Sequence, residues 1–163
     1  MSAEDEFGDF YGSTKDRCLR SLMASGMTQA AAEEALSESF ARAWAAWPRV
    51  REHPQPVAWV MRTALNQHVS WWRRQRREVE LDTHRETLAA SHHEPAGRED
   101  LLRAVAALPL RQRQVVALRI FLDLDTAGTA LVLGIATGSV TAHLHRAMTT
   151  LRHTFREVAP HDR

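Results

Sequence analysis

The stretch that decides the fold lies near the C-terminus and reads TAGTALVLGIATGSVTAHLHR over residues 126–146. Apolar residues recur at helical spacing on both sides of Gly134-Ile135-Ala136. This pattern predicts a short helix over 126–133, a tight turn, and a longer helix over 138–155. Two helices joined by so short a turn have the spacing of a helix-turn-helix.

Small residues stand at two critical positions of this predicted motif. Ala130 lies where two helices cross closely, and Gly134 lies where the backbone needs a positive φ. The inward side of the longer helix is predicted to consist of Val140, Leu144, Ala147 and Leu151. On this stretch alone, an ordinary helical hairpin remains an alternative to a DNA-binding motif.

The rest of the chain also predicts helices, because strand signals are nearly absent and Ala, Leu, Glu and Arg recur at helical spacing. Helices are predicted over residues 5–25, 28–47, 57–77, 101–108 and 112–121. Thr28 is a candidate N-cap, and Gly26 and Pro48 are stop signals. One continuous apolar face of the second helix is predicted to hold Leu36, Phe40, Ala43, Trp44 and Trp47. The predicted fold class is all-α.

Composition and charge divide the chain into two small helical domains joined by a flexible linker. The sequence has 163 residues, 44% hydrophobic, with a net charge of +1. Residues 48–77 carry seven Arg against one Glu, whereas residues 78–100 carry seven acids against two Arg. We therefore expect one domain over 1–77, an exposed linker over 78–97 and a second domain over 98–163.

Targeting signals and cysteine usage point to the cytoplasm. No run of 18 apolar residues occurs, and the first ten residues are acidic where a secretory signal would be basic. The single cysteine, Cys18, permits no intrachain disulfide. We expect a cytoplasmic protein without membrane insertion.

Two motifs, in order and correctly separated, resemble one family. The run LPLRQRQVVALR over 108–119, with Leu133-Gly134-Ile135 and Leu144-His145-Arg146-Ala147, strongly resembles region 4 of the extracytoplasmic-function (ECF) class of bacterial sigma factors. AEEALSESFARAW over 32–44, with AWVMR over 58–62, Asn66 and the arginines of 73–77, resembles region 2. The resemblance covers about residues 7–156.

This resemblance implies an alternative sigma factor, which binds core RNA polymerase, directs it to specific promoters and assists promoter opening. Polymerase supplies the catalysis, so the chain itself is expected not to be an enzyme. Family members are often held inactive by an anti-sigma factor, which is therefore a candidate partner. The surface matching the family's polymerase contact lies on the second helix and holds Glu34, Glu38 and Arg42.

Region 2 of the family also captures the melted strand of the downstream promoter element. A cationic loop and an amide that pairs with an extruded base suit that task. The positions that the resemblance assigns to downstream DNA are Arg49, Arg51, His53, Gln55, Arg62, Asn66, Arg73 and Arg74.

Region 4 reads the upstream element as a duplex, with the second helix of the helix-turn-helix in the major groove. The positions assigned to this role are Thr137, Ser139, Thr141, Ala142, His143, His145 and Arg146. The family's usual Lys-Ser-Arg is replaced here by Thr141, Ala142 and His143, which removes two positive charges. We interpret this as an unusual upstream element or weaker upstream binding.

Other departures concern Ser37, where the family commonly has Gln, Ser70, where it has Asp, and Ala127 with Gly128, where it has an acidic pair. Gly128 inside a helix is expected to cost about 1 kcal/mol relative to Ala.

No cofactor or metal is expected. Neither His92-His93 nor the His143 and His145 pair has the i, i+4 spacing of a helical zinc site. A stand-alone regulator, with an N-terminal sensor or dimerisation domain, is the main alternative. It leaves unexplained why the N-terminal residues follow the order of sigma region 2. An enzyme is a weaker alternative, because phosphate-binding loops and nucleophile elbows are missing from the sequence.

Overall fold

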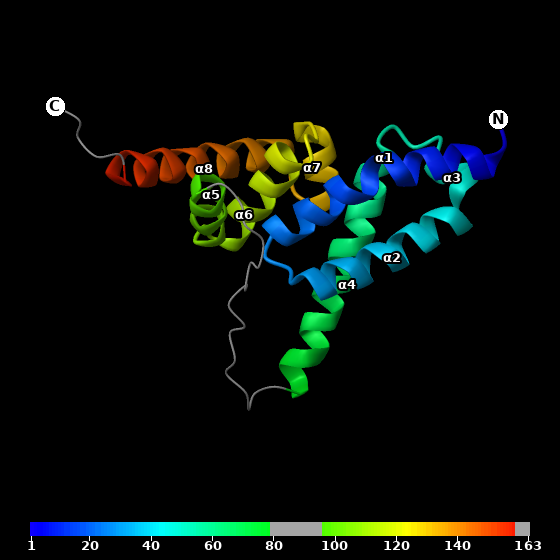
Figure 1. The fold of residues 1–163 in the computed structure, drawn as a ribbon, viewed down its shortest axis with the longest axis horizontal. Coiled ribbons are helices and arrows are strands. Elements are labelled where there is room, and N and C mark those ends of the chain that lie inside the picture. Colours follow the sequence, from blue (N-terminus) through cyan, green and yellow to red (C-terminus); the bar gives the residue numbers. More distant parts are fainter. Residues whose placement is uncertain (79–95, 159–163) are drawn as a thin grey trace. The chain divides into compact units, whose positions relative to one another are not determined.

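The computed structural model describes residues 1–78 and 96–158, with all side chains in these ranges except those of residues 68–78, 96 and 158. The described residues form helices joined by turns and contain no strand, which confirms the all-α prediction (Figure 1). The chain divides into two compact units, Met1–Leu19 with Met27–His93, and Arg20–Gly26 with Glu94–Arg163. Most of the predicted linker, residues 79–95, lies outside the described residues.

The first unit is built on the part of α1 (Ala3–Ala24) that precedes Arg20 and on α2 (Gln29–Ala45), α3 (Trp47–Val50) and α4 (Pro56–Glu78). Ser2 and Asp5 close the start of α1 as a reciprocal capping pair. The Asp5 backbone N–H donates to Ser2 Oγ at 3.1 Å, and the Ser2 N–H donates to Asp5 Oδ2 at 3.0 Å. The pKa of Asp5 is lowered by two hydrogen bonds to its carboxylate, the stronger effect coming from the Ser2 hydroxyl, which donates to Asp5 Oδ2 at 2.7 Å, and the other from the Ser2 backbone N–H.

The second helix starts where the sequence predicted, because Thr28 Oγ1 accepts a hydrogen bond from the Ala31 N–H at 3.2 Å. Gly26 has a φ of 111°, which suits its predicted place after α1. In Figure 1, α2 and α4 cross within the first unit, and the two helices are in contact. Their buried side chains include Leu36, Phe40, Ala58, Met61 and Ala64.

Aromatic rings from α1, α2 and α3 pack at one end of this unit. The Phe7 and Phe10 rings lie 5.2 and 5.3 Å from the Trp47 ring, and Tyr11 meets Phe40 edge-on at 4.9 Å. Trp44, which was predicted to lie on the apolar face of α2, has a side chain that is 43% exposed. Its ring contacts Phe7 at 5.1 Å and stands at the border of the apolar face, where the opposite side stays open to solvent.

The chain after α2 also differs from the prediction. Trp47 and Val50 are buried in a short helix, α3, in which Pro48 occupies the first turn. Proline lacks only an N–H that the first turn of a helix does not use, so it starts α3 as readily as it would end α2. Arg49 therefore lies on a helix and not in a loop, whereas Arg51 to Gln55 form the turn before α4.

The second unit contains α5 (Ala96–Ala106), α6 (Leu110–Val116), η1 (Ala117–Phe121), α7 (Thr126–Leu133) and α8 (Thr137–Val158). The helix predicted over 112–121 begins two residues earlier and continues as η1, a π-helical segment that the sequence did not predict. Asp123 follows with a φ of 59°, and Arg119 donates to the Leu124 carbonyl at 2.6 Å. This connection leads the chain into α7.

Two clusters of buried side chains hold the second unit together. One joins Val105, Leu108 and Val116 to Ala147 and Leu151 of α8. The other joins Val115 of α6 to Ala130 of α7 and Val140 of α8. Val115 and Val116 are neighbours on α6 but belong to different clusters. Helix α6 therefore packs against both the N-terminal and the C-terminal half of α8.

Candidate nucleic-acid and polymerase interfaces

The helix-turn-helix forms with the bounds predicted for its first helix and turn. Asp125 Oδ1 accepts a hydrogen bond from the Gly128 N–H at 2.7 Å and caps α7. Gly134 ends α7 in the left-handed conformation, with φ 64° and ψ 37°, which confirms the expected positive φ. The chain bends by 102° between Thr126–Leu133 and Thr137–Glu157, within the range of helix-turn-helix motifs.

The inward side of α8 matches the predicted pattern. Val140 and Ala147 are fully buried, Leu151 is 7% exposed, and Leu144 is partly buried against the second cluster. Among the positions assigned to upstream DNA, five are exposed, namely Thr137, Ser139, Thr141, His145 and Arg146. Ala142 and His143 are only half-buried. The exposed members are all within the first three turns of α8, where a recognition helix meets base edges.

This motif is almost uncharged. Residues 126–145 contain no Asp, Glu, Lys or Arg, and the first formal charge after Asp125 is Arg146. Within the described residues, no single helix is long and apolar enough to span a membrane. The bent pair of α7 and α8, taken together, reaches that length and composition. Side-chain hydroxyls remain, and Thr141 Oγ1 donates to the Thr137 carbonyl at 3.2 Å.

The predicted polymerase surface lies on the outer side of α2. Glu34, Glu38 and Arg42 are all exposed. Glu38 and Arg42 form an ion pair at 2.7 Å, with both side chains more than half exposed. Such a pair contributes little to stability because solvent screens it, so both charges are available to a partner.

The segment assigned to downstream DNA combines cations with a fixed turn. Arg51 forms an ion pair with Glu6 of α1 at 3.1 Å. His53 Nδ1 accepts a hydrogen bond from the Gln55 N–H at 2.9 Å, which fixes the imidazole over the turn. Arg49 is exposed on α3. The sequence did not indicate that Glu6 would hold Arg51, because nothing marks two residues so far apart as neighbours.

Arg62 and Asn66 are both exposed on α4, four residues apart, and therefore lie on one side of that helix. The side chains of Arg73 and Arg74, like those of Trp71 and Trp72, lie outside the described residues, although the backbone there is helical. Of the positions assigned to downstream DNA, the structure thus places Arg62 and Asn66 together on one side of α4.

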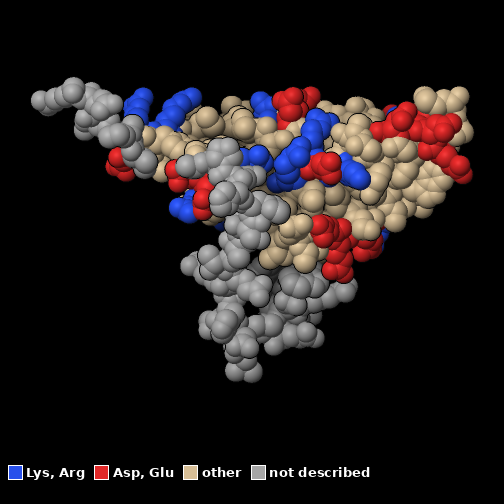
Figure 2. Space-filling view, viewed as in Figure 1, with Lys and Arg blue, Asp and Glu red and all other residues tan. Residues whose placement is uncertain are grey.

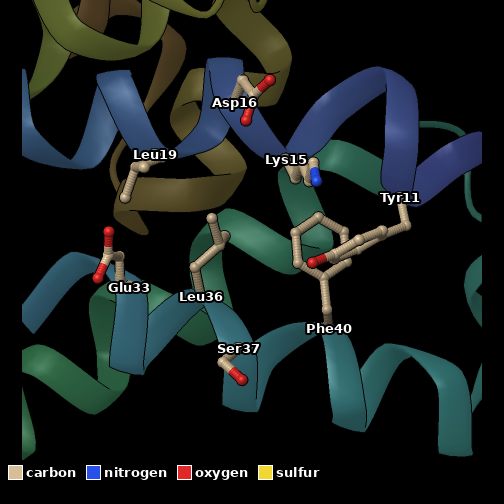
Figure 3. Close-up of a pocket in the computed structure, with 8 residues that line it drawn as sticks. All are labelled: Tyr11, Lys15, Asp16, Leu19, Glu33, Leu36, Ser37 and Phe40. Carbon is tan, nitrogen blue, oxygen red and sulfur yellow. The ribbon is translucent and has the colours of Figure 1, made fainter. Parts of the chain in front are cut away.

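A hollow of about 210 Å³ opens between α1 and α2 in the first unit (Figure 3). Its wall contains Ser37, one of the departures noted above, together with Lys15, whose ammonium lies 5.2 Å from the centre of the Tyr11 ring. The remaining lining residues are Asp16, Leu19, Glu33, Leu36 and Phe40. Helical periodicity does not predict this hollow, and the i, i+4 spacing of Tyr11 and Lys15 is the one sequence feature that relates to it.

Within residues 1–78 and 96–158, we find no group of three or more His, Cys, Asp or Glu side chains that could bind a metal ion. Cys18 is buried, and burial raises the pKa of its thiol to about 12, against a smaller opposing effect of Arg17. A thiol in this state is a poor nucleophile.

Comparison with known protein families identifies the two helical parts. Residues 15–78 match the model of sigma-70 region 2, and residues 98–151 match the model of sigma-70 region 4. These matches fall on the helices that carry the surfaces described above. The class defined by the fold is thus that of sigma factors.

Individual relatives indicate which kind of sigma factor the chain is similar to. The chain is 30% identical over 149 residues to RNA polymerase sigma-E factor of Streptomyces coelicolor, covering 90% of this chain and 84% of the relative. It is 33% identical over 102 residues to ECF RNA polymerase sigma factor SigF of Caulobacter vibrioides, covering 61% of this chain and 57% of the relative.

Solved structures share the fold. The sigma factor RpoE of Bartonella quintana, in complex with the anti-sigma factor NepR, has a TM-score of 0.78 at 18% identity, covering 97% of this chain and 99% of RpoE. CnrH, in complex with the cytosolic domain of CnrY, has a TM-score of 0.65 at 18% identity, covering 96% and 91%.

The chain belongs to the ECF class of RNA polymerase sigma factors. It is an alternative sigma factor that binds core RNA polymerase and promoter DNA and directs the polymerase to promoters. Sigma factors are non-catalytic initiation factors of transcription. The resemblance expected from the two sequence motifs is confirmed.

Proposed function

We propose that this sigma factor divides its work between three surfaces. Glu34, Glu38 and Arg42 of α2 contact core polymerase. The residues around Arg51, Arg62 and Asn66 hold the melted downstream strand and thereby assist promoter opening. The exposed start of α8 reads the upstream duplex. In this proposal residues 1–77 act as region 2, residues 98–163 act as region 4, and residues 78–97 join them.

The observation that carries the upstream assignment is the geometry of α7 and α8. The 102° bend and the left-handed Gly134 leave the first turns of α8 open, with Ser139, Thr141 and His145 exposed. A helix presented this way fits the major groove and can place short polar side chains at base edges. Because this surface lacks Lys and Arg before Arg146, base contacts would contribute a larger share of the binding than phosphate contacts.

The downstream assignment is supported by charge and by the placement of one amide. Asn66 is exposed one helical turn beyond Arg62. An amide offers both a donor and an acceptor to an unpaired base edge, while the guanidinium neutralises nearby phosphate. Arg51 is held by Glu6 and so stands in a defined position before α4.

Regulation by a protein inhibitor is part of the proposal. Both structural neighbours named above were solved in complex with another protein, which for RpoE is an anti-sigma factor. We further propose that the protein acts in the cytoplasm, where polymerase and promoters are found, and that it performs no covalent chemistry of its own.

Promoter-dependent RNA synthesis with purified core polymerase on a promoter library tests this function. Specific transcripts are expected with the protein and not without it. Asn66→Ala should reduce permanganate reactivity of unpaired thymines while leaving polymerase binding intact. Glu34→Arg with Glu38→Arg should abolish co-purification with core polymerase. Thr141→Ala with His145→Ala should change the preferred upstream sequence.

Arg103→Ala is the matched control, because Arg103 is exposed on α5 and pairs only locally with Glu99 and Asp100. It should transcribe like the natural chain. Duplex binding without recruitment of polymerase would contradict the proposal and favour a stand-alone regulator.

A further inference from the structure

Glu6 of α1 lies against Arg51, one of the positions assigned to downstream DNA, although 45 residues separate the two in the sequence. The Oε2 atom of Glu6 accepts a hydrogen bond from Nη1 of Arg51 at 3.1 Å. Both residues belong to the first unit. The hydrogen bond uses one nitrogen of the guanidinium group, so the other N–H groups of Arg51 can still bind a second acceptor.

Arg51 differs from the two other arginines whose side chains are described at the downstream positions. Arg49 of α3 and Arg62 of α4 are exposed, and within the described part of the chain neither forms an ion pair. Of these three arginines, only Arg51 has its charge balanced by a carboxylate of the same unit. A phosphate group that approaches Arg51 therefore meets a neutral pair, whereas at Arg49 or Arg62 it meets a free cation.

The start of α1 carries further negative charge. Glu4 and Asp5 share its first turn with Glu6, and Asp9 follows one turn later. All three neighbours of Glu6 are exposed, and among the described residues none of them forms an ion pair. Figure 2 shows acidic side chains in red gathered over the N-terminal end of α1. Acids in a first turn stabilise a helix through its dipole, but that effect does not explain why Glu6 reaches Arg51.

The pair of Glu6 and Arg51 is accessible to DNA. The Arg51 side chain is 45% exposed, and that of Glu6 is 29% exposed. Solvent screens an ion pair at this exposure, so its contribution to stability is small. A phosphate group of a melted strand can therefore displace the Glu6 carboxylate or share Arg51 with it. In either case the strand gains less from Arg51 than it would gain from an unpaired arginine.

We propose that Glu6 is a further residue of the downstream DNA site, where its carboxylate competes with the phosphates of the strand for Arg51. Phosphate contacts attract every strand alike, whereas base contacts depend on sequence. The competition thus lowers the affinity for any strand and leaves capture more dependent on base contacts, such as those proposed for Asn66. This inference deepens the proposed function and rests on it, because Arg51 must face the strand.

The test uses holoenzyme reconstituted from the full chain and core polymerase. The probe is a fluorescein-labelled promoter that the natural chain selects from the library, with mismatches that keep its downstream element unpaired. Fluorescence anisotropy measures binding over a series of salt concentrations. Glu6→Gln removes the charge and keeps an oxygen that can accept from Arg51, so it should tighten binding about fivefold. The slope of log K against log salt should steepen by about 0.7, the value for one phosphate contact to a single strand.

Glu4→Gln is the matched control, because it removes the same charge from the same turn of α1, at a residue that forms no ion pair in the described part of the chain. It should change the affinity by less than about twofold, since salt screens exposed charges that are not in contact. Glu6→Asp keeps the carboxylate and should bind more like the natural chain than Glu6→Gln does.

Arg51→Gln separates this inference from the proposed function. It should weaken binding, and in its background Glu6→Gln should have no larger effect than Glu4→Gln, because the cation that both acceptors compete for is gone. Unchanged binding by Arg51→Gln would mean that Arg51 does not face the strand, so its downstream assignment would fail together with this inference. Weaker binding by Arg51→Gln without any gain from Glu6→Gln would overturn this inference alone.

Two other results would contradict the competition. Weaker binding by Glu6→Gln would mean that the Glu6 charge helps the strand to bind by holding Arg51 in position. Equal gains from Glu6→Gln and Glu4→Gln would mean that the general negative charge of α1, and not the contact with Arg51, sets the affinity.

Discussion

Asp125 and Gly128 are joined by a 2.7 Å hydrogen bond from the Gly128 N–H to the Asp125 carboxylate, at the point where the chain enters the helix-turn-helix. Asp125→Ala removes this N-cap and is expected to destabilise the second unit by about 1 kcal/mol. Urea denaturation followed by circular dichroism measures the change. Asp125→Ser and Asp125→Asn keep a capping oxygen and should lose much less; equal losses in all three variants would mean that the cap is unimportant.

Gly134 and Gly138 provide a matched pair of substitutions. A Cβ at either position meets no atom within 4 Å, but Gly134 has a φ of 64° whereas Gly138 does not have a positive φ. Gly134→Ala should therefore destabilise by about 1 kcal/mol through backbone strain alone. Gly138→Ala should stabilise by about 0.5 kcal/mol, because alanine favours helix. Opposite shifts in the midpoint of thermal unfolding are expected, and shifts of the same sign would contradict this reading of the turn.

Thr129 is fully buried on α7, and its hydroxyl has no hydrogen-bond partner. Thr129→Val keeps the shape and removes the unsatisfied hydroxyl, so a gain of about 1 kcal/mol in the free energy of unfolding is expected. Thr14 is the control. It is also buried, but its hydroxyl donates to the Phe10 carbonyl at 2.6 Å, so Thr14→Val should not stabilise. A loss of stability in Thr129→Val would indicate that an ordered water satisfies the hydroxyl.

The near-neutral recognition helix makes a prediction about salt. Thr141 is exposed, so Thr141→Lys should place a cation against the phosphates of the upstream duplex. The slope of log K against log salt should steepen by about 0.9 for one added phosphate contact. His143→Arg should have a smaller effect, because His143 is half-buried. Thr150→Lys adds the same charge at an exposed position beyond the first turns of α8 and should leave the slope nearly unchanged; an equal steepening would point to non-specific attraction.

Cys18 reports on the opening of the first unit. Burial raises the pKa of its thiol from an ordinary 9.0 to about 12, so the folded chain keeps the thiol proton in a pH range where the unfolded chain releases it. The contribution of this group to stability is therefore complete below pH 9 and falls as the pH rises from 9 towards 12. Reaction with a disulfide reagent at pH 8 should be slow in the native protein and fast in urea. Rapid native reaction would mean that α1 opens readily.

Local signals explain which parts of the fold could be predicted from sequence. The end of α7 follows from Gly134, whose left-handed conformation few other residues favour, and its start follows from the capping carboxylate of Asp125. The start of α2 follows from Thr28, whose hydroxyl caps that helix in the same way. Pro48 was ambiguous, because proline both ends one helix and begins another, and only the burial of Trp47 and Val50 in the packed bundle decides for α3.

Features that depend on distant residues could not be predicted. Periodicity assigns Trp44 to the apolar face, but its exposure depends on how far the Phe7 ring covers it. The π-helical turn of η1 adds one residue to the turn without any residue type that marks it. For the candidate surfaces, the outward position of Glu34 followed from helical spacing, whereas the Arg51 and Glu6 pair and the hollow of the first unit required the packed helices.

The ammonium of Lys15, which lies over the Tyr11 ring beside the hollow of the first unit, belongs to the only lysine in the chain. Every other basic side chain that could bind DNA or polymerase is an arginine or a histidine. Acetylating enzymes and amine-directed crosslinkers therefore meet a single lysine side chain, and they leave the proposed nucleic-acid surfaces chemically unmodified. A probe attached covalently to Lys15 would therefore lie at a single known position on α1 and would report the approach of any partner to that helix.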